Sequence, residues 1–337
     1  MNQPIISRRV ALFGAAALAL AANRTSAQST PVASPTAAAF PVTIKHLYGE
    51  TTIESASTRV VTLGWSTSDA VIALGLVPVG IPADTWAGDA DGFLPWTRAA
   101  IGDAALPAAL DTAAGIPFEA IAALNPDLIL APYSGVTEEE YETLSKIAPT
   151  VPPKDGLWAS SWQDLTRVTG LVLGLAPEAE QLIADTDAYV ASEAAKFPAL
   201  AGKSFVYGNM GDGTTSFNIY TNGDPRPQFL ESMGLVPSEL VEELSADPEN
   251  LYYGTVSYEL ANTIVADIVV FWFTDEAEHE AAIATSYYQA IPAVAAGTFA
   301  AIIGREYVMA TSAFSTLSIA FALGEFLPTL AAAAANA

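Results

Sequence analysis

Two segments of the chain, 140 residues apart, share one pattern. Glu119 lies eight positions before Asp127 in PFEAIAALNPDLIL, and Glu259 lies eight positions before Asp267 in VSYELANTIVADIVV. In both, the glutamate begins a short stretch with apolar residues at helical spacing, and the aspartate precedes an apolar, β-branched run typical of a buried parallel strand. The repeat predicts two similar halves, each with a carboxylate at an equivalent place on its surface. A carboxylate that complements its helix dipole is the alternative for either glutamate alone.

The order of the expected elements favours an α/β fold. RVVTLGW is expected to form a strand, and residues 66–76 are expected to form a helix with a hydroxyl cap. VPVGIPA and DLILAPY are expected to form further strands, followed by a helix over 138–148 that the chain leaves through PTVPP. This alternation predicts a parallel sheet covered by helices. Further along, KSFVYGNM and ADIVVFWF are expected to form strands, and residues 307–331 a strand, a loop and a helix.

The middle of the chain is helical over 161–175 and 177–197, with Pro177 suited to a first helical position and Pro198 past the end. The second helix, of about 20 residues, would be about 30 Å long. A helix of that length between two α/β halves makes a stiff connector. The predicted organisation is an N-terminal lobe over 41–160, a helical connector over 161–201 and a C-terminal lobe over 202–337.

Composition excludes several classes of site. The chain has no cysteine, which removes disulfides, thiolate metal sites, thiol nucleophiles and a lipid-anchoring cysteine. Its two histidines, His46 and His279, leave little room for a histidine-rich zinc site or for acid/base catalysis. The formal net charge of −24 would repel nucleic acid and anionic membrane surfaces, so neither is expected as a partner. Most of this charge is expected to form a solubilising surface.

The first 27 residues are typical of an export signal. Arg8 and Arg9 precede the apolar stretch LFGAAALALAA, and small residues near Ala27 offer a cleavage site. The arginine pair resembles a twin-arginine signal, which implies export after folding; an ordinary secretory signal is the alternative. Residues 28–40 are expected to form a flexible tether. The protein is therefore expected in the periplasm or at the outer face of the cytoplasmic membrane, where an uncleaved signal could serve as its anchor.

The order and spacing of several segments resemble a known family. RVVTLGW, FEAIAALNPDLILAPYSG, LSKIAPTV, the helical connector and VSYELANTIVADIVV are similar to segments of the iron-siderophore and cobalamin substrate-binding proteins of ABC importers, the class III proteins with a helical backbone. YSGVTEEEYETLSKIAPTV and PWTRAAIGD look most like the ferric-siderophore branch. The likeness spans residues 42–330. It implies an α/β fold of two Rossmann-like lobes joined by a long rigid α-helix, with the ligand cleft between the lobes.

The same resemblance implies what the protein does and with which partners. A member of this family captures a ferric siderophore and delivers it to ABC permease subunits, on which Glu119 and Glu259 would dock. No cofactor and no metal site of the protein's own are expected, because iron arrives as part of the siderophore complex. The protein is expected to be a monomer.

In open α/β sheets the ligand lies beyond the carboxyl ends of the strands. Those ends carry aromatic residues, whose flat faces suit a bulky chelate, although core packing is the alternative for each. Arg226 in GDPRPQFL is the best candidate to bind ligand oxygens, followed by Arg98, with a surface ion pair as the alternative. So few arginines favour a neutral hydroxamate over a highly anionic catecholate. The predicted ligand-binding residues are Trp65, Trp86, Tyr133, Tyr207, Arg226 and Trp272.

Two other functions stay open from the sequence. The same fold could bind heme or a corrinoid, and Tyr133 could ligate heme iron. A secreted enzyme is the third possibility. The sequence contains no GxSxG, HExxH or phosphate-binding glycine loop, so an enzyme would have to work through carboxylates. We therefore predict no catalytic residue.

Overall fold

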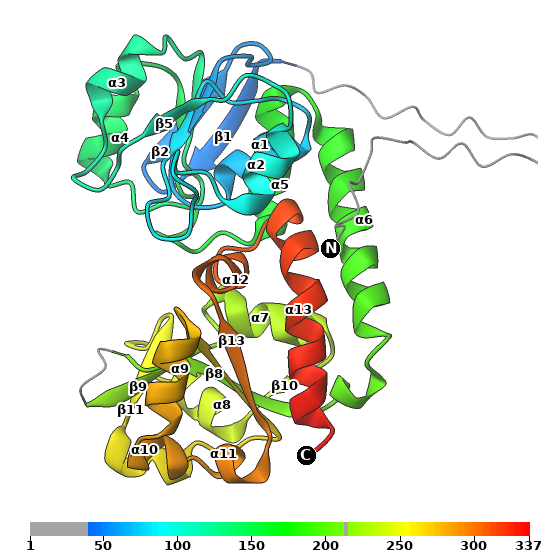
Figure 1. Cartoon of the computed structure of the whole chain (residues 1–337). Helices are drawn as coiled ribbons and strands as arrows, with labels where there is room; N and C mark the ends of the chain where they lie inside the picture. Colours follow the sequence, from blue (N-terminus) through cyan, green and yellow to red (C-terminus); the bar gives the residue numbers. More distant parts are fainter. Residues whose placement is uncertain (1–39, 212–214) are drawn as a thin grey trace, which may run out of the picture. The chain divides into compact units, whose positions relative to one another are not determined.

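The computed structural model describes residues 40–211 and 215–337. The predicted export signal over 1–27 lies outside the described residues, as does the predicted tether except for its last residue, Phe40. In the described part, two α/β lobes are connected by helix α6 (Ala176–Ala194), as Figure 1 shows. The predicted fold class is confirmed.

The N-terminal lobe contains a parallel five-stranded sheet in the order β5–β4–β3–β6–β7. From β3 the chain first adds strands on one side and then, with β6 and β7, on the other. The point between β3 and β6 is therefore the topological switch point of this sheet. An antiparallel β1–β2 hairpin completes the lobe. The elements are β1 (Val42–His46), β2 (Gly49–Ile53), β3 (Val60–Thr62), α1 (Thr67–Ala73), β4 (Gly80–Pro82), α2 (Pro95–Ile101), β5 (Ala108–Leu110), α3 (Phe118–Ala123), β6 (Leu128–Leu130), α4 (Glu138–Leu144), β7 (Thr150–Val151) and α5 (Trp162–Leu173).

The C-terminal lobe contains a mixed six-stranded sheet in the order β11–β9–β8–β12–β13, with β10 also paired to β8. The pairs β8–β10, β8–β12 and β12–β13 are parallel, whereas β9 runs antiparallel to β8 and β11 antiparallel to β9. The elements are η1 (Pro198–Leu200), β8 (Ser204–Asn209), β9 (Ser216–Tyr220), α7 (Pro225–Ser232), β10 (Val236–Pro237), α8 (Glu239–Ser245), β11 (Tyr253–Ser257), η2 (Tyr258–Thr263), β12 (Ile268–Phe273), α9 (Glu276–Ile283), α10 (Ser286–Gln289), α11 (Pro292–Ala296), β13 (Phe299–Ile303), α12 (Arg305–Ala310) and α13 (Thr316–Ala334), where η marks a 3-10 helix.

The two aspartates of the repeated segments do the same structural work in each lobe. Asp127 accepts hydrogen bonds from the backbone N–H groups of Thr58 and Arg59, both at 2.9 Å, just before β3. Asp267 accepts hydrogen bonds from the backbone N–H and the hydroxyl of Ser204, at 2.8 and 2.9 Å, at the start of β8. Each aspartate thus fixes the beginning of the strand that pairs in parallel with its own. This equivalence explains why the spacing recurs.

Two local predictions were wrong. Ser66 does not cap α1 with its side chain: its φ is 59°, and its hydroxyl donates instead to the carbonyl of Ala313 at 2.7 Å. The strand expected from Tyr307 onward is helix α12, and the strand at this place is β13, which ends at Ile303. Gly304, with φ 105°, turns the chain between them. The apolar run of α12 is too short for its periodicity to separate helix from strand.

Helix α5, which the sequence assigned to the connector, packs in the core of the N-terminal lobe through Val172 and Leu173, together with the β1–β2 hairpin. The connection between the lobes is therefore α6, whose 19 residues span about 28 Å. Pro177 is its second residue, one position later than predicted. Pro198, placed past the end of this helix by the sequence, begins η1.

Helix α13 makes a second connection that the sequence did not reveal. It covers the C-terminal sheet, runs beside α6, and at its first turns contacts α1 and α2 of the N-terminal lobe (Figure 1). It is the one helix in the described residues long and apolar enough to cross a membrane, but half of its apolar window is buried within the protein. Its contacts with β12, β13 and α6 identify it as a core helix.

A buried carboxylate joins the start of α13 to the N-terminal lobe. Asp69 of α1 is 2% exposed and accepts hydrogen bonds of 2.7 Å from the indole N–H of Trp96 and the hydroxyl groups of Thr97 and Ser315. Ser315 also caps α13 by accepting the backbone N–H of Ser318. Burial raises the pKa of Asp69, although the three hydrogen bonds act in the opposite direction. The first turn of α13 is thus fixed to both lobes.

These two connections lead to a prediction about motion. Because α6 is a continuous helix and α13 contacts both lobes, we expect small-angle scattering curves with and without ligand to differ little. A calibration protein that closes around a flexible two-stranded hinge would show the contrast. A large compaction of this protein on ligand binding would contradict the stiff connection.

Candidate ligand-binding site between the lobes

The carboxyl ends of β3 and β6 meet at the switch point of the N-terminal sheet. Gly64, directly after β3, has φ 75°, and a Cβ atom at this position would lie 2.1 Å from the carbonyl oxygen of Tyr133. The next residue, Trp65, donates its backbone N–H to that same oxygen at 3.0 Å. Only glycine permits this close approach. It places the rings of Trp65 and Tyr133 beside each other.

A third aromatic residue, Trp158, completes this group. Its ring centroid lies 5.1 Å from that of Trp65 and 5.8 Å from that of Tyr133. Trp158 has a left-handed backbone with φ 56°, and its N–H donates to the carbonyl of Ser134. Its indole also covers Gly135, where a Cβ atom would lie 2.8 Å from the indole nitrogen. A bulky residue in this strained region is typical of a functional site.

Trp86 lies on a loop with a fixed shape. One carboxylate oxygen of Asp84 accepts the backbone N–H of Trp86 at 2.9 Å. Arg98 forms ion pairs with Asp89 and Asp91 at 2.8 and 2.7 Å, and its hydrogen bond holds the pKa of Asp89 down at about 2. Arg98, the second candidate for ligand binding, therefore organises the loop that presents Trp86.

The C-terminal lobe contributes Arg226, the second residue of α7. Its guanidinium forms an ion pair of 2.7 Å with Asp224, donates from Nε to the hydroxyl of Ser312 at 3.1 Å, and lies 4.1 Å from the ring centroid of Tyr220. Asp224 also caps α7 by accepting the N–H of Arg226 at 2.9 Å. The side chains of Arg226 and Asp224 are 12% and 7% exposed. Burial raises the pKa of Asp224, while the charge of Arg226 opposes that shift.

One cavity of about 350 Å³ brings the groups from both lobes together. Trp65 and Trp86 line it from the N-terminal lobe, and Arg226 and Trp272 from the C-terminal lobe. The indole N–H of Trp272 donates to the Tyr220 hydroxyl at 3.0 Å, which fixes the ring at the cavity wall. Four of the six predicted ligand-binding residues therefore share one cavity. The other lining residues are Ala83, Asp84, Thr85, Val308, Met309 and Ser312.

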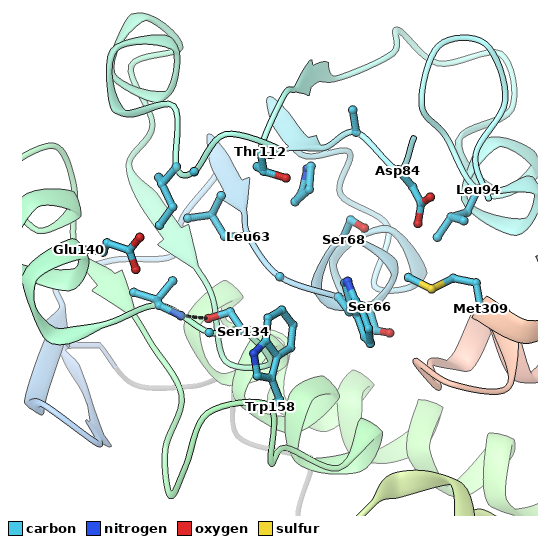
Figure 2. Close-up of a pocket in the computed structure, with 18 residues that line it drawn as sticks. Leu63, Ser66, Ser68, Asp84, Leu94, Thr112, Ser134, Glu140, Trp158 and Met309 are labelled. Atoms are coloured by element: carbon cyan, nitrogen blue, oxygen red, sulfur yellow. Dashed lines mark hydrogen bonds between the residues drawn. The ribbon is translucent and has the colours of Figure 1, made fainter. Parts of the chain in front are cut away.

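A second cavity, of about 310 Å³, adjoins the first, because both are lined by Trp65, Ala83, Asp84 and Met309. Most of its wall comes from the N-terminal lobe. Figure 2 shows side chains from separate loops and from the first turns of α1 and α4 gathered around it: Ser66, Ser68, Thr112, Ser134, Glu140 and Trp158. The first cavity has room for a group that packs against the indole rings, and the second has room for a polar part of the same ligand.

The amino-acid sequence matches a known protein family. The profile described as "Periplasmic binding protein" matches residues 60–302. The chain belongs to the periplasmic binding protein family. It is also 30% identical over 214 residues to the Fe(3+) dicitrate-binding periplasmic protein FecB of Escherichia coli (strain K12), a match that covers 60% of this chain and 64% of FecB.

Solved structures support the same relationship for this binding protein. PiaA of Streptococcus pneumoniae TIGR4, in complex with ferrichrome, is 34% identical with a TM-score of 0.79, covering 88% of this chain and 99% of PiaA. A periplasmic solute binding protein from Mycobacterium smegmatis is 26% identical with a TM-score of 0.72, covering 87% and 98% of the two chains. The class of protein expected from the sequence is thereby confirmed.

Two of the predicted ligand-binding residues, Tyr133 and Tyr207, do not line the cavity of about 350 Å³ in this binding protein. Tyr207 is fully buried, its hydroxyl donates to Thr311 at 3.2 Å, and its ring packs against Tyr220 and Phe326. It belongs to the core, so its assignment to the ligand site is wrong. Tyr133 is 6% exposed and lines a separate cavity of about 170 Å³, and burial raises its pKa to about 12.

Sequence reasoning also missed residues at the site. Trp158 lies in a loop after β7, and the rule that places ligands at the carboxyl ends of strands does not select it. Asp224 gave a local signal, since an aspartate two positions before Arg226 in GDPRP is well placed to cap the helix. Ser312 lies in a loop 86 positions after Arg226, so no local pattern in the sequence indicates their hydrogen bond.

The paired glutamates occupy matching places on the two lobes. Glu119 is the second residue of α3, and Glu259 is the second residue of η2. Both are exposed, and in the described parts of the chain neither carboxylate has a hydrogen-bond or ion-pair partner. The helix that begins near Glu259 is a 3-10 helix, unlike the α-helix at Glu119. Neither glutamate lines either of the cavities at the lobe junction.

Proposed function

We propose that this protein captures a ferric siderophore between its lobes and delivers it to an ABC importer. The observation that carries the proposal is the 350 Å³ cavity to which each lobe contributes large aromatic or charged side chains. Two relatives support it by what their names describe, namely ferrichrome in PiaA and ferric dicitrate in FecB.

The chemistry of the cavity suits a chelate better than a free ion. Indole rings offer wide, rigid contact faces at little entropic cost, and a guanidinium can donate to the oxygen atoms of a chelating group. Among the described residues, no group of three or more His, Asp or Glu side chains is placed to hold a metal ion. Iron would therefore arrive already coordinated, as part of the ligand, and the proposal includes no cofactor.

Tryptophan fluorescence tests this proposal. Trp65 and Trp86 are 41% and 39% exposed at the cavity, so a ferric chelate such as ferrichrome should quench the intrinsic emission. Trp65→Ala and Trp86→Ala should each reduce the quenching and weaken affinity by about tenfold, the equivalent of about 1.4 kcal/mol of aromatic contact. Tyr189→Ala, on the exposed side of α6, is the matched control. Full affinity in both tryptophan variants would remove these residues from the site.

The proposal extends to location and partners. The protein would be exported by its N-terminal signal and work as a monomer in the periplasm or at the outer face of the cytoplasmic membrane. Glu119 and Glu259, exposed on separate lobes, would meet basic groups on the permease subunits. Leu260, next to Glu259, is also exposed, and a large apolar residue beside a charge suits a docking surface.

The heme alternative loses support from the geometry. Tyr133, the iron ligand expected in this alternative, is 6% exposed and does not line the cavity of about 350 Å³ between the lobes. A Soret band in the protein purified from its native host would contradict the siderophore proposal. No arrangement of carboxylates in the two main cavities favours the enzyme alternative.

A further inference from the structure

We infer that Asp224 makes this site selective for ferric chelates without net negative charge, by neutralising Arg226 inside the cavity. The inference rests on the proposed function and adds the chemical class of ligand. Fe³⁺ bound by three singly charged hydroxamates is neutral, whereas three doubly charged catecholates leave the complex with three negative charges. The site would accept the first class and disfavour the second.

Arg226 contacts Asp224, Ser312 and Tyr220. Its Nη1 is 2.7 Å from a carboxylate oxygen of Asp224, its Nε donates to Ser312, and Tyr220 lies under its plane. Both charged side chains are at least seven-eighths buried, so solvent screens their attraction only weakly. Nη2 has no hydrogen-bond partner among the described residues, and it can donate to one ligand oxygen. The guanidinium thus keeps a donor for the ligand, while its charge is already balanced.

The other charged side chains that line the two cavities are carboxylates. The two adjoining cavities are lined by Arg226 and by the carboxylates of Asp84 and Glu140, with no other charged side chain among their lining residues. Figure 2 shows Asp84 and Glu140 on opposite sides of the second cavity. Arg305 reaches Trp86 from the C-terminal lobe but is exposed, so its charge is screened. With Arg226 paired, the lining carries an excess of negative charge.

A neutral and an anionic chelate would meet these charges differently. A neutral trihydroxamate complex accepts one hydrogen bond from Nη2 and contacts the indole rings. Because it has no net charge, the carboxylates do not repel it. A trianionic chelate meets the same contacts and is repelled by Asp84, Glu140 and Asp224. If Asp224 loses its charge, Arg226 becomes a partly buried, unpaired cation, which is costly until an anion binds beside it. The selectivity should then shift towards anionic chelates.

Asp224→Asn tests the inference. Asparagine caps helices as well as aspartate does, so α7 keeps its first hydrogen bond while the charge is lost. Dissociation constants are measured by tryptophan quenching for ferrichrome, a neutral trihydroxamate, and for a ferric tricatecholate of similar size. The wild-type protein should prefer ferrichrome. In the variant, the ratio of the two constants should move towards the tricatecholate by about tenfold or more.

The control is Asp164→Asn on α5. Asp164 also pairs with an arginine, Arg167, at 2.7 Å, but the pair is exposed and neither residue lines the two cavities. This substitution changes the net charge of the protein by the same amount, and the selectivity ratio should stay as in the wild type. An equal shift in the control would overturn the inference, because it would assign selectivity to overall charge.

The outcomes separate this inference from the function on which it rests. If the wild-type protein binds neither of these chelates nor ferric dicitrate, the proposed function is wrong. If it binds both and prefers the tricatecholate, selectivity through Asp224 is wrong, whatever the variants do. If it prefers ferrichrome but Asp224→Asn, or Asp224→Ser as a second variant that keeps the cap, leaves the ratio unchanged, Asp224 does not set the selectivity.

Discussion

Asp69→Ala is expected to lower the free energy of unfolding by about 3 to 5 kcal/mol. The substitution leaves three buried donors without an acceptor, namely the Trp96 indole and the hydroxyl groups of Thr97 and Ser315. Because Ser315 begins α13, the loss also weakens the contact between the lobes. Urea denaturation followed by circular dichroism measures the change. An unchanged midpoint would show that this network adds nothing to stability.

Asp69→Asn separates the hydrogen bonds from the charge. The amide oxygen can still accept from Trp96 and Ser315, so a smaller loss than in the alanine variant is expected. Burial raises the pKa of Asp69 in the folded state above its unfolded value of about 3.9. The stability that this group contributes is therefore present at acid pH and is lost as the pH rises through the folded-state pKa. The wild-type advantage over Asp69→Asn should shrink as the pH rises from about 3.9 through the folded-state pKa, and an advantage that grew instead would contradict the direction of the shift.

The parts of the fold that follow from local chemistry could be predicted from the sequence. The recurrence of Asp127 and Asp267 was visible because each aspartate must stand directly before its strand to accept hydrogen bonds from the neighbouring one. The long helix α6 was visible because its length and its flanking prolines are local signals. Both patterns are made by residues a few positions apart and are therefore readable in the sequence, although the hydrogen bonds of the two aspartates join residues 63 to 69 positions apart.

Other features depend on contacts between distant segments. Ser66 has a left-handed backbone, and its hydroxyl donates to the carbonyl of Ala313 in the other lobe instead of capping α1. Tyr207 lies in a strand that is buried on both faces, and alternation cannot tell which side chains of such a strand reach a ligand. Trp158 takes its left-handed backbone in a loop whose shape no local signal fixes. The candidate site was therefore predicted by residue type and by strand end, but its supporting contacts were not.

Glu119→Ala combined with Glu259→Ala should reduce the initial rate of ferric-siderophore uptake by about tenfold or more at limiting ligand, with each single change less severe. Complementary charge raises the rate of association and fixes the register of two surfaces, and the two glutamates would supply it once on each lobe. Folding should barely change, because an exposed carboxylate contributes roughly 0 to 1 kcal/mol. Ligand affinity should also stay the same, since neither residue lines the cavities.

Uptake is measured with iron-labelled siderophore in cells that express the protein's own permease, after affinity and melting temperature have been compared in vitro. The control double variant, Glu142→Ala with Glu239→Ala, removes one exposed carboxylate from a helix of each lobe and so matches the change in net charge. A loss of uptake specific to the first double variant would place docking at Glu119 and Glu259. If uptake is normal in that variant, the docking role is wrong, and the two carboxylates only complement the positive ends of their helices.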